Sequence, residues 1–248
     1  AIEKARLLER IVESEELLRQ NEKLSALGLL AGEVAHEIRN PLTVLKMLYH
    51  SLELKFPKND PREEDVRIMG EKMDHLNNIV EQILTFARNA EPQFKPSDIN
   101  KTIDDLRILV RQKIAQQNVQ LDVQLSDNLP KVKADDQQLS QVFLNLTLNA
   151  LEAMPNGGKL TIKSDSIQLS ENDKNPTHIR IEFSDTGSGM DSESRKKAFT
   201  SLLNSNKPGG TGIGLAIVNR IIESHSGQIK IKSNAIGTTF SIHIPIQN

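Results

Sequence analysis

The sequence predicts a multi-domain chain: an all-α helical hairpin that forms a dimeric four-helix bundle, followed by an α+β domain in which helices cover a sheet as an α/β sandwich. Three observations lead to this prediction. Apolar residues recur at heptad spacing as far as Ala87. A segment with two prolines, Asn89–Ser97, then interrupts that pattern. Beyond it, helical and strand periodicities alternate.

The first domain is expected to hold two long helices. Residues 1–55 are rich in Glu, Leu, Arg and Lys with Pro41 as the one proline, which favours a single helix. Its apolar seam follows steps of three and four residues through Leu17, Leu24, Leu27, Ala31, Val34 and Ile38. After a proline-containing turn at 57–61, the same spacing returns in Val66, Met69, Met73, Leu76, Val80, Ile83 and Ala87. A lone hairpin would leave these stripes half exposed, so we expect a homodimer.

Composition excludes several classes of protein. The chain has 31 Lys+Arg against 33 Asp+Glu, a net charge of −2 that argues against nucleic acid as a partner. Without Cys there is no disulfide scaffold, no Cys-ligated metal and no Cys nucleophile. Because no stretch of about 18 apolar residues occurs, we expect a cytoplasmic protein without direct membrane contact. The chain begins inside a helical pattern without an initiator Met, so we expect a fragment whose parent carries any membrane anchor upstream.

The second domain alternates helices and strands. We expect helices over 99–114, 135–154 and 212–225, strands over 119–125, 159–169, 178–184, 228–232 and 238–244, and a polar, glycine-rich loop over 186–211. These lengths predict a mainly antiparallel sheet with helices on one face.

The first motif with chemical potential lies in the first helix. With Val34 and Ile38 in the seam, His36 points into water beside Glu37, which can accept the Nδ1 proton and leave Nε2 to attack an electrophile. Pro41 removes a backbone donor one turn later and is expected to bend the helix there. A His–Glu pair on a helix is also a common surface feature, so this motif alone leaves the function open.

The second motif, Asp185-Thr-Gly187-Ser-Gly189, follows an apolar strand. A buried carboxylate at a strand end can accept a hydrogen bond from an exocyclic amine, and the glycines let a ligand approach the backbone. Asp-Thr-Gly also occurs in aspartic proteases, which need two such carboxylates in an all-β body. A calcium loop is excluded because the alternating oxygen side chains are missing. A plain glycine-rich turn remains the alternative.

Two further motifs concern phosphate and metal. Lys207, Gly210, Thr211, Gly212 and Gly214 precede a helix at Leu215, so backbone N–H groups and the helix dipole can face a phosphate. The spacing is neither the dinucleotide fingerprint nor a P-loop. On another helix, Asn145, Asn149 and Glu152 share one face and can hold a hydrated Mg²⁺, although an ordinary polar face gives the same pattern.

In this order the four motifs resemble those of the sensor histidine kinases of two-component signalling, over nearly the whole chain. His36-Glu37-x-x-Asn40-Pro41 is similar to the phosphoacceptor box and Asn145-x-x-x-Asn149 to the nucleotide–Mg²⁺ box. Asp185-x-Gly187-x-Gly189 is similar to the adenine box, Gly210-x-Gly212-x-Gly214-Leu215 to the lid hinge, and Gly237-Thr238 to the closing strand. The resemblance implies a signalling coiled coil (1–27), a dimerisation and phosphotransfer hairpin (28–90), a linker (91–97) and an ATP-binding domain (98–248).

The resemblance also implies roles for these residues. His36 accepts the γ-phosphoryl group of ATP with Glu37 as base, and passes it to the receiver domain of a response regulator, which Asn40 helps to dephosphorylate. Asn149, with Asn145, ligates Mg²⁺. Asp185 binds the adenine amine, and Lys207 and Thr238 lie near the nucleotide. Membrane attachment of the parent protein is an expectation from the family alone.

Two alternatives stay open. Related ATPases of the same nucleotide fold activate water with a Glu one turn before the Mg²⁺ Asn, where this chain has Asn145, an amide that cannot act as a base. In the lid, only Phe199 and Lys207 match the usual Phe-x-Pro-Phe-Phe-Thr-Thr-Lys pattern. The altered stretch 200–206 therefore keeps open a nucleotide-binding scaffold or a phosphatase-biased sensor.

Overall fold

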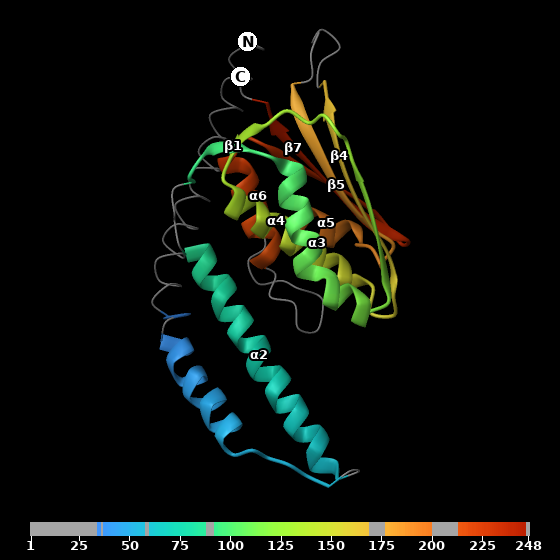
Figure 1. Ribbon diagram of the computed structural model, residues 1–248. Helices are drawn as coiled ribbons and strands as arrows, with labels where there is room; N and C mark the ends of the chain where they lie inside the picture. The colour runs from blue at the N-terminus through green and yellow to red at the C-terminus, as the bar shows by residue number, and fades with distance from the viewer. Residues whose placement is uncertain are drawn as a thin grey trace, which may run out of the picture. The chain divides into compact units, whose positions relative to one another are not determined.

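The computed structural model describes residues 34–35, 37–57, 60–87, 92–168, 177–199 and 213–246. The chain divides into two compact units, Ala1–Ala90 and Glu91–Asn248, and Figure 1 shows a helical hairpin in the first and a sheet with helices in the second. Among the described residues, no helix is both long and apolar enough to cross a bilayer.

The first unit is the predicted hairpin. Residues 37–51 are helical, Pro41 included, and α2 spans Pro61–Ala87. Proline suits the first position of α2 because the N–H it lacks would have no acceptor within the helix. Glu63 and Glu64 in the first turn favour the positive end of the helix dipole. His36 and the seam upstream of Val34 lie outside the described residues.

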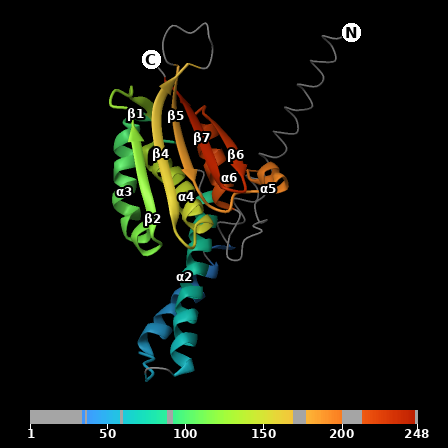
Figure 2. The same ribbon diagram turned by 90° about the vertical axis from the view of Figure 1, so that its right-hand side faces the viewer.

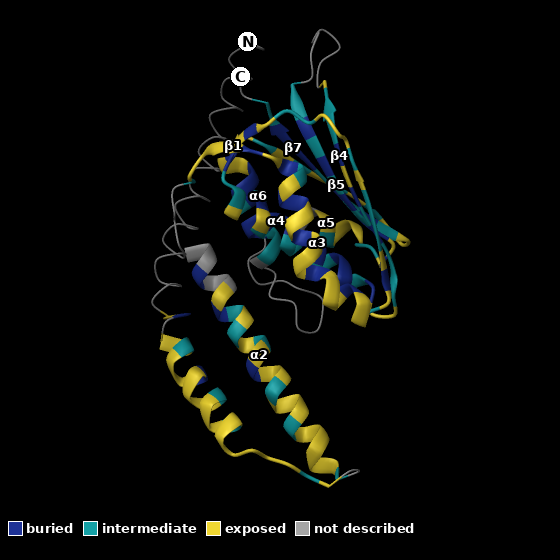
Figure 3. Cartoon of the chain, in the orientation of Figure 1, coloured by how far each residue is buried: buried dark blue, intermediate teal, exposed yellow. Residues whose placement is uncertain are grey.

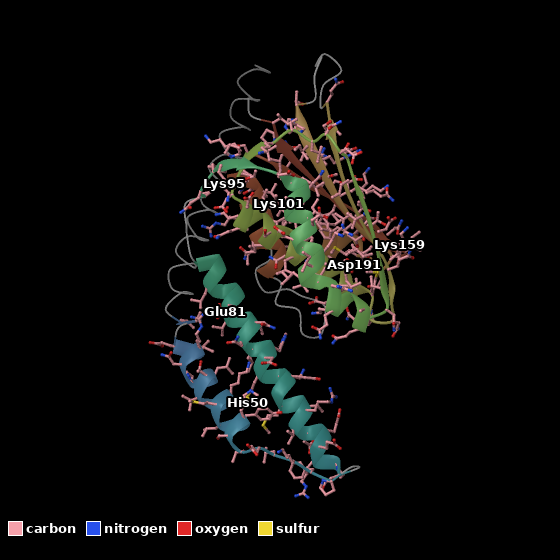
Figure 4. All side chains as sticks on the ribbon, viewed as in Figure 1. His50, Glu81, Lys95, Lys101, Lys159 and Asp191 are labelled. Atoms are coloured by element: carbon pink, nitrogen blue, oxygen red, sulfur yellow. The ribbon has the colours of Figure 1, made fainter. Side chains whose placement is uncertain are left out.

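Apolar side chains fill the interface between the two helices. The buried ones are Ala35 and Leu42 from the first helix and Met73, Val80 and Leu84 from α2. Two ion pairs cross the hairpin at its surface: Arg39 lies 2.5 Å from Glu81 (Figure 4), and Lys46 lies 2.6 Å from Asp74. Exposed pairs of this kind stabilise a fold by less than about 1 kcal/mol each, so apolar packing holds the hairpin together.

Much of both hairpin helices is exposed, drawn in yellow in Figure 3, and the exposed residues include a second apolar stripe. It comprises Val34, Ile38, Leu45, Leu48 and Leu52 of the first helix with Met69 and Leu76 of α2, each between 43% and 64% exposed. Sequence periodicity placed Val34 and Ile38 in the seam, whereas the hairpin interior takes Ala35 instead. A helix in a four-helix bundle contacts two neighbours and needs two adjacent stripes, and the hairpin satisfies one of them.

The second unit is a five-stranded sheet covered on one face by helices (Figures 1 and 2). Its strand order is β2-β4-β5-β7-β6, with β2 parallel to β4 and the other pairs antiparallel. The strands are β2 (Val119–Leu125), β4 (Gly158–Ile167), β5 (His178–Asp185), β6 (Gln228–Asn234) and β7 (Gly237–Pro245). The covering helices are α3 (Ile99–Gln116), α4 (Asp136–Ala153) and α6 (Ile213–Ser224). The predicted fold class is thus confirmed.

Three short elements depart from the sequence prediction. β1 (Lys95–Ser97) pairs with β3 (Val132–Ala134), so the last three residues of the segment predicted as linker form a strand. Helix α5 (Ser192–Lys197) interrupts the stretch predicted as loop, with Asp191 as its N-cap. Elements of three to six residues are too short for periodicity to reveal.

Candidate functional site

Asp185 ends β5 as a buried carboxylate. Along β5, buried and half-buried residues alternate, so Asp185 follows Ile179, Ile181 and Phe183 on the face that the helices cover. Its side chain is 7% exposed. The Asp185 Oδ1 atom accepts hydrogen bonds from the backbone N–H of Gly187 at 2.8 Å and of Thr238 at 3.3 Å. Two backbone donors compensate the cost of burying this oxygen and fix the carboxylate in one orientation.

The glycines after Asp185 let the loop pass between two other elements. A Cβ on Gly187 would lie 2.6 Å from the Cβ of Ala153, at the end of α4. Gly189 has a φ of +67°, and a Cβ there would lie 1.6 Å from the Asn234 carbonyl oxygen. The loop is therefore pressed between the end of α4 and the β6–β7 turn, and only glycine fits at both positions.

Ser233 is a polar contact of this loop that sequence reasoning missed. Its Oγ accepts a hydrogen bond from the Met190 N–H at 2.8 Å and lies 2.9 Å from the Thr238 hydroxyl. Thr238 itself is 4% exposed. Ser233 therefore ties the loop after Asp185 to the closing strand. No local pattern marks this serine, because Met190, its partner in the loop, lies 43 positions away in the sequence.

Asn145 and Asn149 lie one turn apart on α4. Their side-chain amide nitrogens are buried and have no hydrogen-bond partner among the described residues. An unpaired buried polar group costs about 1–3 kcal/mol, so such atoms usually meet a ligand or water. Asn149 is also one turn before Ala153, whose carbonyl oxygen accepts the Ser188 N–H at 3.2 Å, which relates this pair to the loop after Asp185.

The Oδ1 atoms of these two side chains suit a nucleotide-bound magnesium ion, and their unpaired Nδ2 groups suit phosphate oxygens or water. Among the described residues there is no group of three or more His, Cys, Asp or Glu that could hold a metal. Mg²⁺ takes oxygen ligands and completes its shell with water and substrate phosphates. Two amide side chains, each with an oxygen acceptor, are therefore sufficient protein ligands when phosphates supply the remainder.

Part of the predicted phosphate site can be placed. Gly214 and Leu215 lie in the first turn of α6, both half-buried, and a Cβ on Gly214 would meet no atom within 4 Å. Lys207, Gly210, Thr211 and Gly212 lie outside the described residues. In the first unit, Glu37 and Asn40 are exposed on the helix 37–51, which makes them accessible to a partner or substrate.

The comparisons with known proteins match both units. Residues 26–92 match the His Kinase A (phospho-acceptor) domain, and residues 134–248 match the family described as Histidine kinase-, DNA gyrase B-, and HSP90-like ATPase. The sensor histidine kinase ZraS of Escherichia coli (strain K12) is 34% identical over 230 residues, which cover 92% of this chain and 48% of ZraS. The chain thus spans about half the length of this curated relative.

Solved structures of histidine kinases share the fold. The catalytic domain of histidine kinase ThkA matches with 30% identity and a TM-score of 0.53, over 62% of this chain and 95% of that domain. ThkA in complex with response regulator protein TrrA matches with 27% identity and a TM-score of 0.67, over 95% of this chain and 66% of ThkA. Full-length ShkA in complex with AMPPNP matches with 25% identity and a TM-score of 0.69, over 87% of this chain and 45% of ShkA. The chain belongs to the sensor histidine kinases of two-component signal transduction and carries their phosphoacceptor and ATP-binding domains.

Proposed function

We propose that this chain is a kinase core in which His36 takes the γ-phosphoryl group of ATP and passes it to an aspartate of a response regulator. The observation that carries the proposal is the buried Asp185 carboxylate, held by two backbone N–H groups within a domain of the ATPase family. The match of residues 26–92 to the phosphoacceptor domain family supports His36 in this role, because His36 lies within that range. The complex of ThkA with a response regulator supports that class of partner.

Adenine recognition rests on Asp185. An ionised carboxylate is an acceptor only, with about four lone-pair sites. It can therefore accept a hydrogen bond from the exocyclic amine of adenine while it keeps the two backbone donors, and it repels the carbonyl that guanine carries at the same place. Thr238 and the loop glycines Gly187 and Gly189 line the approach to this carboxylate.

The phosphates need charge compensation. Mg²⁺ held by Asn149 and Asn145 would neutralise charge on the phosphate oxygens. Lys207 and the glycines from Gly210 to Gly214, ahead of α6, would add backbone donors and positive charge. These residues position the nucleotide, which is most of what phosphoryl transfer asks of a protein.

The transfer step itself takes place at His36. Nε2 of a neutral imidazole forms the new N–P bond while the bond from the γ-phosphorus to the bridging oxygen breaks, and ADP leaves. Glu37 takes the Nδ1 proton, so that the phosphorylated ring stays neutral. Asn40 is exposed one turn along and would orient the water that dephosphorylates the response regulator, so its exposure supports a phosphatase activity at the same helix.

The exposed stripe of the hairpin supports a homodimer. Seven apolar side chains from both helices form it, at the spacing that a four-helix bundle buries. A second hairpin provides the same stripe in return, as a two-fold interface requires.

The test is incubation of the chain with γ-labelled ATP and Mg²⁺, beside His36→Gln, followed by acid and alkali treatment. A phosphoramidate survives alkali and is lost in acid, so the proposal expects alkali-stable label that is absent from the variant. ATP consumption without such label would identify an ATPase instead. Nucleotide binding without label or turnover would identify a scaffold. The altered stretch 200–206 would then be the first candidate cause of the missing kinase activity.

A further inference from the structure

One carboxylate joins the incoming chain to the helix that carries Asn145 and Asn149. Asp135 Oδ1 caps α4 by accepting the backbone N–H of Gln137 at 2.9 Å and of Gln138 at 3.1 Å. Asp135 Oδ2 accepts the backbone N–H of Gln93 at 2.8 Å. The same side chain thus caps α4 and binds the backbone of Gln93, which lies 42 residues upstream.

His225, the residue directly after α6, contacts the same junction. Its Nε2 accepts the backbone N–H of Asp135 at 3.0 Å, and its Nδ1 lies 2.8 Å from the Ile221 carbonyl oxygen. A ring nitrogen that accepts leaves the proton on the other one, so this ring is neutral with hydrogen on Nδ1. The Phe94 and His225 rings pack against each other in a T-shaped arrangement with the centroids 5.1 Å apart. His225 is 3% exposed, so burial favours this neutral form.

The contacts continue along the incoming chain. Lys95, labelled in Figure 4, lies 2.9 Å from the Asp136 carboxylate, and β1 pairs with β3 just before α4 begins. We call Gln93, Phe94, Asp135 and His225 the entry anchor. It brings together the segment that enters the ATP-binding domain, the first turn of α4 and the end of α6.

We propose that the entry anchor sets the length of chain between the phosphoacceptor hairpin and the ATP-binding domain, with Asp135 and His225 as its positioning residues. Five residues, 88–92, separate the end of α2 at Ala87 from Gln93. At no more than about 3.6 Å per residue they reach about 20 Å. We call this connecting segment the tether. Without the anchor, Lys95 in β1 is the first residue bound to the ATP-binding domain, so the tether is longer by Gln93 and Phe94.

The consequence is for delivery of the nucleotide, and in this respect the inference rests on the proposed function. A longer tether lowers the effective concentration of the ATP-binding domain at the phosphoacceptor helix. It also lets the domain adopt more orientations, so fewer of them are productive. Asp135 lies more than two turns from Asn145, so loss of the anchor should leave the nucleotide contacts intact. It should change only how the ATP-binding domain is delivered to the phosphoacceptor helix.

The experiment separates the two duties of Asp135. Asn caps helices as well as Asp does, but Asp135→Asn replaces the second acceptor oxygen with a donor that faces the Gln93 N–H. Asp98→Asn is the matched control, since Asp98 caps α3 in the same way, through Asn100 and Lys101, and lies beyond β1. Phe94→Ala tests the ring contact without touching the cap.

In the full chain we expect Asp135→Asn and Phe94→Ala to lower the maximal autophosphorylation rate by about 2- to 10-fold, at unchanged apparent KM for ATP. Hydrogen exchange at the Gln93 N–H should accelerate in Asp135→Asn. Asp98→Asn should match the wild type in all of these. A wild-type rate in Asp135→Asn, or a KM that rises as the rate falls, would overturn the inference. If the wild type takes no label, the proposed function fails while hydrogen exchange still tests the anchor.

Discussion

Thr238 donates its backbone N–H to Oδ1 of Asp185 across 3.3 Å, although 53 positions separate the two residues. They are register partners on the antiparallel strands β7 and β5. The pairing of these strands therefore orients the carboxylate, and under the proposed function we expect base recognition to depend on the charge and acceptor character of this one side chain.

Asp185→Asn should weaken the preference for adenine with little change of shape. The amide oxygen can keep the bonds from Gly187 and Thr238, but its NH₂ then opposes the adenine amine. We expect ATP affinity to fall about 10- to 100-fold, while ITP, which carries a carbonyl in place of the amine, loses less. Calorimetry with both nucleotides measures this. The control is Asp191→Asn, an exposed N-cap of α5 (Figure 4); equal losses for ATP and ITP would contradict base recognition by Asp185.

Asn149→Ala should remove the dependence of nucleotide binding on Mg²⁺. In the wild type, chelation of the metal should weaken ATP binding, because the amide and the phosphates no longer share an ion. In Asn149→Ala, binding should be weak by about 10-fold or more and insensitive to chelator. Ser140→Ala, on an exposed position of the same helix, is the control. A variant that still responds to Mg²⁺ as the wild type does would assign the metal to other residues.

The elements that sequence reasoning located are those with long periodic signals. Helix α4 and strand β5 match their predicted ranges within two residues, because core packing imposes their periods of 3.6 and 2. Asp185 was placed correctly at a strand end because apolar alternation led up to it. Ser233, Asp135 and His225 were missed as partners: their roles come from hydrogen bonds across 43, 42 and 90 positions, and no local spacing encodes such contacts.

Gly189→Ala should disturb the loop after Asp185. The positive φ and the contact with the Asn234 carbonyl leave no room for a methyl group. We expect a free energy of unfolding lower by about 1–3 kcal/mol together with weaker ATP binding. Gly214→Ala provides the stability control, because a Cβ there has open space in a helix and alanine is favoured over glycine by up to about 1 kcal/mol. Denaturant titration compares the two, and equal stabilities would be inconsistent with this packing.

Leu45→Glu should dissociate the homodimer. Leu45 is 56% exposed in the stripe assigned to the dimer interface, and a carboxylate buried there lacks a partner. We expect a monomer by sedimentation at concentrations where the wild type is dimeric. Met47→Glu is the control: Met47 is 72% exposed but lies two residues along the helix, off the stripe. If both variants dissociate, or neither does, the stripe is not the dimer interface.

Acid should weaken the ATP-binding domain partly through His225. Burial lowers the pKa of His225 below 6.5, against the opposing influence of the Ile221 carbonyl and Asp135. The unfolded chain therefore takes up the proton first as pH falls, so the contribution of His225 to stability is complete above about pH 6.5 and is lost below it. His225→Gln keeps an acceptor at the Nε2 position and cannot titrate.

The unfolding midpoint of His225→Gln should consequently decline less than that of the wild type between about pH 7.5 and 5.5. Some decline should persist, because burial and then the positive charges of Lys230, Arg180 and His178 also lower the pKa of His243, with Glu182 opposing them. His243→Gln should therefore remove a further part of it, and the double variant more than either single one. If the His225→Gln midpoint falls as steeply as that of the wild type, protonation of His225 does not destabilise the fold. The hydrogen bond from the Asp135 N–H to His225 would then make no pH-dependent contribution to stability.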